Sequence, residues 1–192
     1  MRFLTTLALL VLSPLAFAQD RSWEAKLDTE FRGGKVVLDL SAGGYKILPT
    51  AADGKIRVRW ATKHVDQMKD AQVRVVVEGG EAHIRTRAPR EDFRVEIEVP
   101  ARVNLEARLS VGELSIKGIE GDKDLRCRIG EIHVAVPDPQ AYGHVDARVK
   151  IGEIGGRPFG ESKEGFFRTF CWEGKGSFRI DARVGIGEVR FE

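Results

Sequence analysis

The chain has little cysteine, little histidine and no excess of either charge. Its 192 residues include two cysteines, Cys127 and Cys171, so no framework of several disulfides holds the fold, although an oxidising compartment would allow one bond. The 31 basic and 29 acidic residues nearly balance, which argues against a nucleic-acid-binding protein. The four histidines are scattered without zinc-like spacing, so no metal and no cofactor is predicted.

Enzyme signatures are also missing. The sequence contains no Gly-x-Ser-x-Gly, His-Glu-x-x-His or Cys-x-x-Cys motif, and no phosphate-binding loop. Its charged residues are spread evenly along the chain, whereas the acids and bases of an active site gather in one cleft. A protein without catalytic activity is therefore predicted.

Long apolar runs are absent apart from one near the N-terminus. Leu4–Leu12 follows Arg2 and precedes Ala16-Phe17-Ala18, which is the layout of a secretory signal peptide. The run is shorter than the ~20 residues of a membrane-spanning helix. We therefore expect cleavage near Ala18, which leaves one domain, residues 19–192, that is periplasmic or secreted and has no transmembrane segment.

The sequence does contain one motif that is repeated four times. Each copy centres on a Gly-Glu pair, with an acid six residues before the glycine and an arginine four residues before it. Such a repeat predicts four equivalent structural units. The glycines are Gly112, Gly130, Gly152 and Gly187. The acids are Glu106, Asp124, Asp146 and Asp181, and the arginines are Arg108, Arg126, Arg148 and Arg183.

Alternating apolar residues in each copy predict a β-strand with one buried face. In the first copy these are Ala107, Leu109 and Val111, and all three are expected to face the interior. After the glycine the alternation slips by one residue, to Leu114 and Ile116. A β-bulge or a sharp corner introduces such an extra residue, and glycine tolerates the positive φ that this position often needs. The four glycines are therefore predicted to be structural turns.

The intervals between the copies favour a parallel β-solenoid. Successive glycines are 18, 22 and 35 residues apart, and a fainter copy without the acid and the arginine centres on Gly43. Each copy would then lie on the next, with arginine above arginine. An antiparallel β-sandwich, in which intervening strands separate the copies, is the alternative. Both folds are all-β. Further strands are predicted at Lys55–Trp60, Gln72–Val77, Ala82–Arg87 and Phe93–Val99.

The longest interval contains an aromatic-rich insertion, at about residues 155–176. These aromatic residues either cap one end of the stack or form an exposed recognition patch. Cys171 lies in the insertion, and Cys127 occupies a position that is apolar in the other copies. A Cys127–Cys171 disulfide would fix the insertion to the stack if the two Cα atoms come within about 7 Å. The aromatic residues of the candidate patch are Phe166, Phe167, Phe170 and Trp172.

Several stretches of the chain follow one recognisable pattern: KVVLDLSAGGYKIL, FRVEIEVPARVNLEARLSVGELSI, and the returning RIGEIHV and KIGEIGG. In these stretches the chain resembles the bacterial adhesin family known as DUF4097 and, more distantly, the GIN-type adhesin-head domains. The resemblance extends from about Gly33 to the end of the chain. It implies a stacked β architecture in an exported bacterial protein, without an established site. The family usually has Gly-Asp or Ser-Gly where this chain has Gly-Glu, and the aromatic insertion is peculiar to this chain.

The charged rows allow two interpretations each. The four arginines form either a solvated ladder of salt bridges with the nearby acids or a binding strip for an anionic polymer or a partner. The four glutamates that follow the glycines either face water or provide Ca²⁺ ligands or a glycosidase pair.

The sequence as a whole favours an exported, non-catalytic protein that binds or scaffolds an unidentified envelope component, either a protein or a glycan. A carbohydrate-active enzyme on a β-helix and a component of an envelope-stress sensor are the alternatives.

Overall fold

The computed structural model describes residues 25–51, 54–63, 65–89 and 92–192, with the backbone alone for residues 65 and 161–166. The predicted signal peptide lies outside the described residues. The described chain consists of β-strands, three short 3-10 helices and connecting segments, which confirms the all-β prediction. None of the described helices is long and apolar enough to cross a membrane.

The four strands predicted outside the repeats begin and end within one residue of the prediction. The strands of the first half are β1 Ala25–Glu30, β2 Lys35–Leu40, β3 Gly43–Pro49, β4 Lys55–Ala61, β5 Gln72–Glu78, β6 Glu81–Arg87 and β7 Arg94–Val99. Those of the second half are β8 Asn104–Ile116, β9 Lys123–Val134, β10 Tyr142–Gly156, β11 Glu161–Glu173 and β12 Phe178–Phe191. The 3-10 helices are η1 Val65–Asp70, η2 Pro139–Ala141 and η3 Arg157–Phe159.

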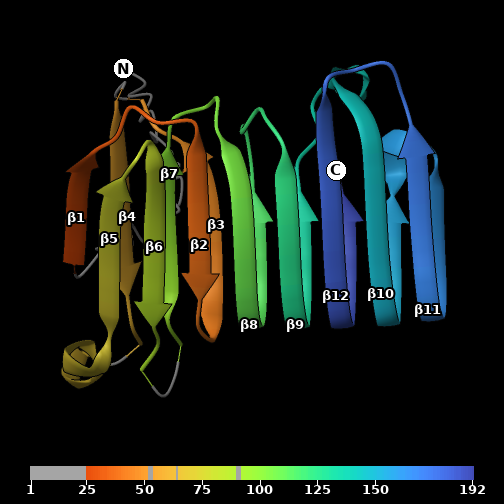
Figure 1. Cartoon of the computed structure of the whole chain (residues 1–192). Coiled ribbons are helices and arrows are strands. Elements are labelled where there is room, and N and C mark those ends of the chain that lie inside the picture. Colours follow the sequence, from red (N-terminus) through yellow and green to blue (C-terminus); the bar gives the residue numbers. More distant parts are fainter. Residues whose placement is uncertain (1–24, 52–53, 64, 90–91) are drawn as a thin grey trace, which may run out of the picture.

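The four Gly-Glu copies form the long strands β8, β9, β10 and β12, and each of them runs through both layers of the molecule (Figure 1). β2 pairs with the first part of β8, up to Leu40 opposite Leu109. β3 pairs with its last part, from Gly43 opposite Gly112. The sheet is therefore folded along the line of glycines, so that the two parts of each long strand lie in opposite layers.

The long strands are parallel and in register, in the order β8, β9, β12 and β10. β12 lies between β9 and β10, so Gly187 pairs with both Gly130 and Gly152. The expectation that consecutive copies are neighbours is thus correct for Gly112 and Gly130 and wrong for Gly130 and Gly152. β10 and β11 precede β12 in the chain, but it is β12, the last strand, that lies directly beside β9.

Antiparallel strands border the parallel region. β11 pairs with β10 at one end of the sheet, and β1, β4 and β7 pair antiparallel in the layer that contains β3. In the other layer, β5 and β6 form a hairpin beside β2. The result is one large mixed sheet that is not closed. It combines the parallel, in-register copies expected of a solenoid with the two facing layers expected of a sandwich.

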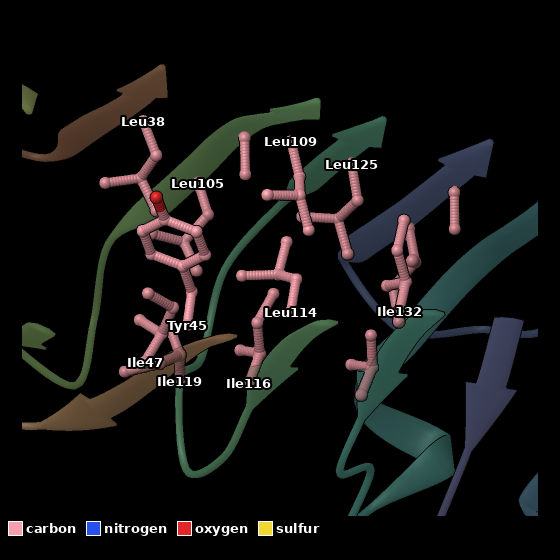
Figure 2. Packing of buried hydrophobic residues seen from close by; sticks show 14 of the residues in the cluster. Leu38, Tyr45, Ile47, Leu105, Leu109, Leu114, Ile116, Ile119, Leu125 and Ile132 are labelled. Atoms are coloured by element: carbon pink, nitrogen blue, oxygen red, sulfur yellow. The ribbon is translucent and has the colours of Figure 1, made fainter. Parts of the chain in front are cut away.

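Apolar side chains fill the space between the two layers (Figure 2). Leu109 and Leu125 belong to the first parts of β8 and β9, and Leu114 and Ile132 belong to the parts that follow the corner. All four are buried in one continuous cluster. Burial of such a side chain stabilises a fold by roughly 1.5–3 kcal/mol, so this row of leucines and isoleucines holds the layers together.

One lysine lies at the margin of this core. The side chain of Lys123 is 2% exposed, and its Nζ donates hydrogen bonds of 2.9 Å to the carbonyl oxygen of Gly121 and to the hydroxyl of Tyr142. Burial lowers the pKa of Lys123 to about 8, although Asp122 and Glu120 oppose this change. Burial likewise raises the pKa of Tyr142 to about 12. Lys123 is therefore a charge held inside the protein by hydrogen bonds rather than by a direct ion pair.

Candidate functional site

The predicted turn glycines lie at the fold line between the layers. Their φ angles are 126° at Gly112, 132° at Gly130, 134° at Gly152 and 134° at Gly187, a region that favours glycine. A Cβ on any of them would overlap the carbonyl oxygen of the glycine on a neighbouring strand. Each corner thus requires glycine for two reasons. The backbone has a positive φ there, and the neighbouring strand approaches too closely to leave room for a Cβ.

The corner turns a row of apolar residues outward. Strand pairing passes from Leu109–Cys127 to Val111–Ile129 without a pair between them, so the buried alternation stops at Leu109. Ile129, Ile186 and Ile151 are 42%, 48% and 43% exposed. The predicted burial of the last apolar residue before each glycine is therefore wrong for these three isoleucines, and Val111 is half-buried, because the strand already bends at this position. We call the aligned residues Val111, Ile129, Ile186 and Ile151 the corner ridge.

Charged residues flank the corner ridge, but they form a complete row only on the side of the glutamates, because Ser110 and Gly185 precede Val111 and Ile186. Arg128 and Lys150 come directly before ridge residues, and the glutamates of the Gly-Glu pairs come two residues after them. Among these glutamates, Glu131 lies 2.9 Å from Nε2 of His133, and Glu188 accepts a 2.7 Å hydrogen bond from Arg190. Two of the four candidate carboxylates therefore have basic partners on their own strands.

The aromatic insertion contributes both to the core and to the surface. Phe170 is buried on β11 beside Phe159 and Phe191, and Trp172 packs against the core. Phe167 is 81% exposed and has a φ of 50°, which is strained for a residue with a side chain. The side chain of Phe166 lies outside the described residues, while its backbone pairs with Ile151 of the corner ridge. The insertion thus covers one end of the stack and also exposes one phenylalanine beside the ridge.

The candidate arginine strip lies on the outer face of the layer that contains β2, where Arg108 pairs with Asp39. Arg108, Arg126, Arg183 and Arg148 are aligned on adjacent strands, in that order. Each arginine contacts the acid two residues before it on its own strand, at distances between 2.6 and 3.1 Å. At Arg126, the hydrogen bond and the charge of Asp124 raise the pKa further above its usual value. The strip exists as a geometric row, but every positive charge in it is paired.

The structure contradicts the suggested disulfide. Both cysteines are free; Cys127 is buried in β9 and Cys171 is exposed on β11. β12 and β10 lie between these strands, so the two residues are separated by three strand spacings of ~4.8 Å. That separation is about twice the largest Cα distance that a disulfide spans.

On the outer face of β10 and β11, His144 meets two side chains that are far from it in sequence, Cys171 and Glu173. Nδ1 of His144 lies 2.7 Å from Oε1 of Glu173, and Sγ of Cys171 lies 4.0 Å from the same oxygen. Spacing along the chain could not reveal this group, because it forms only when β11 folds back antiparallel on β10.

An open groove of about 1320 Å³ lies beside Gly43 and Gly112. Its walls carry both signs of charge. The basic residues are Lys46, Lys63, Arg94 and Lys117, and the acidic ones are Asp92, Glu96, Glu113 and Glu131.

No model of a known protein family matches the chain, and no curated protein matches it either. Solved structures do match. A putative cell adhesion protein from Clostridium sporogenes is 12% identical with a TM-score of 0.51, over 87% of this chain and 98% of that one. A putative adhesin from Bacteroides fragilis is 9% identical with a TM-score of 0.27, over 88% of this chain and 96% of that one. A putative lipid binding protein from Parabacteroides distasonis is 10% identical with a TM-score of 0.28, over the same shares. The first match shows a shared fold.

Proposed function

We propose that the protein is an exported, non-catalytic binding or scaffolding protein of the bacterial cell envelope, adhesin-like in its mode of action. The corner ridge, which ends beside Phe167, is the proposed contact surface. The observation that carries this proposal is the row of three isoleucines, each between 42% and 48% exposed, on adjacent strands. Contiguous exposed apolar side chains are typical of interaction sites.

The ridge is suited to binding because its scaffold is rigid. Each of its strands is hydrogen-bonded on both sides, and the touching glycines fix the bend at every strand. A partner that lies along the ridge would therefore meet apolar side chains repeated every ~4.8 Å, without a cost for ordering a loop. Arg128 and Lys150, which precede ridge residues, would add contacts with a negatively charged partner.

The arginine strip is a weaker candidate for the same role. Its four guanidinium groups are already paired with acids on their own strands, so the field that they present to an anionic polymer is small. We propose further that the four long strands act as the coils of a solenoid and keep the rows straight. Likeness to a cell adhesion protein of the same fold supports a binding role.

Envelope fragments from the source bacterium are the probe that tests this proposal. Co-sedimentation is measured for the purified protein, for Ile129→Ser/Ile186→Ser/Ile151→Ser and for Phe167→Ser. Val76→Ser/Val77→Ser is the matched control, because these valines are 38% and 39% exposed on β5, at the other end of the sheet. Thermal unfolding of each variant checks that the fold is retained.

We expect the ridge variant to bind at least tenfold more weakly, a loss of about 1.4 kcal/mol, and the control to bind like the unaltered protein. Equal losses in the ridge and control variants would show non-specific adsorption and would refute the proposal. Protease or glycosidase treatment of the fragments then identifies the partner as protein or glycan.

A further inference from the structure

The outer face of β10 and β11 carries four potential metal ligands in two cross-strand pairs. His144 is directly opposite Glu173, and Asp146 is directly opposite Cys171. Side chains in such positions have Cβ atoms about 4.5–5.5 Å apart. The ligand atoms of His144, Cys171 and Glu173 lie within 4.8 Å of one another. We propose that these three residues form a zinc-binding site.

The donor set favours zinc over harder cations. Imidazole nitrogen, thiolate sulfur and carboxylate oxygen are the three protein ligands that Zn²⁺ uses, whereas Ca²⁺ and Mg²⁺ take oxygen alone. Zinc bond lengths of about 2.0–2.3 Å place the ligand atoms of a tetrahedral site roughly 3.3–3.8 Å apart. Small side-chain rotations reach this geometry from the observed arrangement, in which the contact between Nδ1 of His144 and Oε1 of Glu173 is 2.7 Å and that between Sγ of Cys171 and the same oxygen is 4.0 Å. Binding releases the thiol proton to solvent.

The backbone around the site is fixed on both sides. β10 is paired with β12 as well as with β11, so it cannot shift without breaking the parallel stack. Beyond the end of β11, Gly174 donates a 2.9 Å hydrogen bond to the carbonyl oxygen of Gly143, and Gly176 donates one of 3.1 Å to that of Tyr142. The ligands therefore stand on a preformed platform rather than on a loop.

Asp146 provides a second, independent observation. Asp146 is 8% exposed as a residue, and its Oδ2 accepts a 3.2 Å hydrogen bond from Arg148. Its Oδ1 is buried and lies 3.0 Å from Nε of Arg148 without a hydrogen bond of acceptable geometry. A buried carboxylate oxygen with spare acceptor capacity, beside Cys171, suits a water molecule on the metal. Three protein ligands and one water form the open type of zinc site, which leaves a coordination position for an external ligand.

The remaining histidines within the described ranges provide internal controls. His83 lies 3.5 Å from Glu81, and His133 lies 2.9 Å from Glu131, each on its own strand. Neither has a cysteine among the potential metal ligands around it in the described part of the chain. His133 also lies 3.8 Å from Glu192, which follows β12. The combination at His144 therefore differs from an ordinary surface pair of histidine and glutamate by its thiol.

Metal titration of the purified chain, kept reduced and first stripped of metal by a chelator, tests the site. Zn²⁺ binding is measured by calorimetry, and Co²⁺ is used as a spectroscopic probe of the ligands. The variants are Cys171→Ser, His144→Gln and Glu173→Gln, with His83→Gln and Cys127→Ala as matched controls. Alkylation of Cys171, followed by mass spectrometry with and without Zn²⁺, reports on the thiol itself.

We expect one Zn²⁺ per chain and a thiolate-to-cobalt charge-transfer absorption with Co²⁺. Zn²⁺ should also slow the alkylation of Cys171 by at least tenfold. Each ligand variant should weaken Zn²⁺ binding by at least tenfold, Cys171→Ser should abolish the charge-transfer absorption, and both controls should bind like the unaltered chain. The proposal is overturned by no stoichiometric binding at micromolar Zn²⁺, by binding that survives Cys171→Ser, or by equal losses in His83→Gln.

Discussion

The two halves of the molecule build the same two layers in different ways. From β8 onward, a single strand crosses from one layer to the other at each Gly-Glu pair. In the first half, separate strands supply the two layers: β2 ends at Leu40 and β3 begins at Gly43. β5 and β6 turn at Gly79 and Gly80, where both φ angles are positive, as in a tight hairpin. Continuity through the corner is thus a property of the second half of the chain, including β11, which lacks the Gly-Glu motif but passes the corner with Gly165 opposite Gly152.

The junction between the halves shows what replaces continuity. Gly43 pairs with Gly112 and has a φ of 153°, so it still occupies a corner position. Around it, the hydroxyl of Tyr45 lies 2.8 Å from that of Thr86 and 3.1 Å from that of Ser41. Burial raises the pKa of Tyr45. A buried polar network therefore lies at this end of the stack, in addition to the close contact between Gly43 and Gly112.

The largest expected effect comes from adding a side chain inside the stack of corners. Gly130→Val should destabilise the protein by about 4 kcal/mol or more, because the valine would overlap Gly112 and resist the positive φ. Gly44→Val is the matched control, since a Cβ at Gly44 has no atom within 4 Å. Thermal and urea unfolding measure both. Similar melting temperatures for the two variants would show that contact between corners is not what requires glycine.

A smaller effect is expected from the buried lysine of the repeat half. Lys123→Met should stabilise the fold at pH 7 by roughly 1–3 kcal/mol. At this pH the folded protein carries a buried positive charge on Lys123, whose pKa burial lowers to about 8, and the substitution removes the cost of burying that charge. The unfolded chain has the higher pKa, 10.5, and binds more protons between these values, so the unaltered protein gains stability as pH rises from 8 to 10.5. Unfolding in urea at pH 7, 9 and 10.5 measures the free energy of unfolding of both proteins. The difference in favour of the variant should shrink as the pH rises, and a difference that is the same at all three pH values would contradict this prediction.

The smallest effect is expected from the charged face, and it should be equal in the two halves. Arg108→Gln in β8 and Arg85→Gln in β6 each remove one exposed ion pair, with Glu106 and Asp39 respectively. Each change should alter stability by less than about 0.5 kcal/mol, because exposed pairs contribute little in water. Melting temperatures at low and high salt check this. A loss above 1 kcal/mol for Arg108→Gln alone would indicate that the arginine rows stabilise the repeats.

The sequence predicted the repeats well because their signal is local. The alternation of Ala107 and Leu109 and the positions of the four glycines follow directly from strand and corner geometry. The position of Ile186 was wrongly predicted because alternation describes a straight strand, whereas this residue already lies in the bend. Strand order was also out of reach: all four copies have the same register, so nothing in β9 distinguishes β10 from β12 as its neighbour.

The candidate sites depended even more on tertiary structure. Ile129, Ile151 and Ile186 are aliphatic residues in strands, and composition alone assigns such residues to the core. The group of His144, Cys171 and Glu173 joins residues 27 to 29 positions apart in sequence through the hairpin of β10 and β11. The segment that forms β11 lacks the Gly-Glu motif, so its pairing register could not be derived from the repeats.

Disulfide trapping of strand neighbours tests the central claim most directly. In a Cys127→Ala/Cys171→Ser background, Glu131→Cys/Glu188→Cys joins positions that are paired in the structure, whereas Glu131→Cys/Glu153→Cys joins positions separated by β12. Paired Cα atoms lie ~4.8 Å apart and permit a disulfide, while twice that spacing does not. We expect rapid crosslinking of the first pair under mild oxidation and little of the second. Crosslinking of the second pair in preference to the first would place consecutive copies side by side and contradict the order β8, β9, β12, β10.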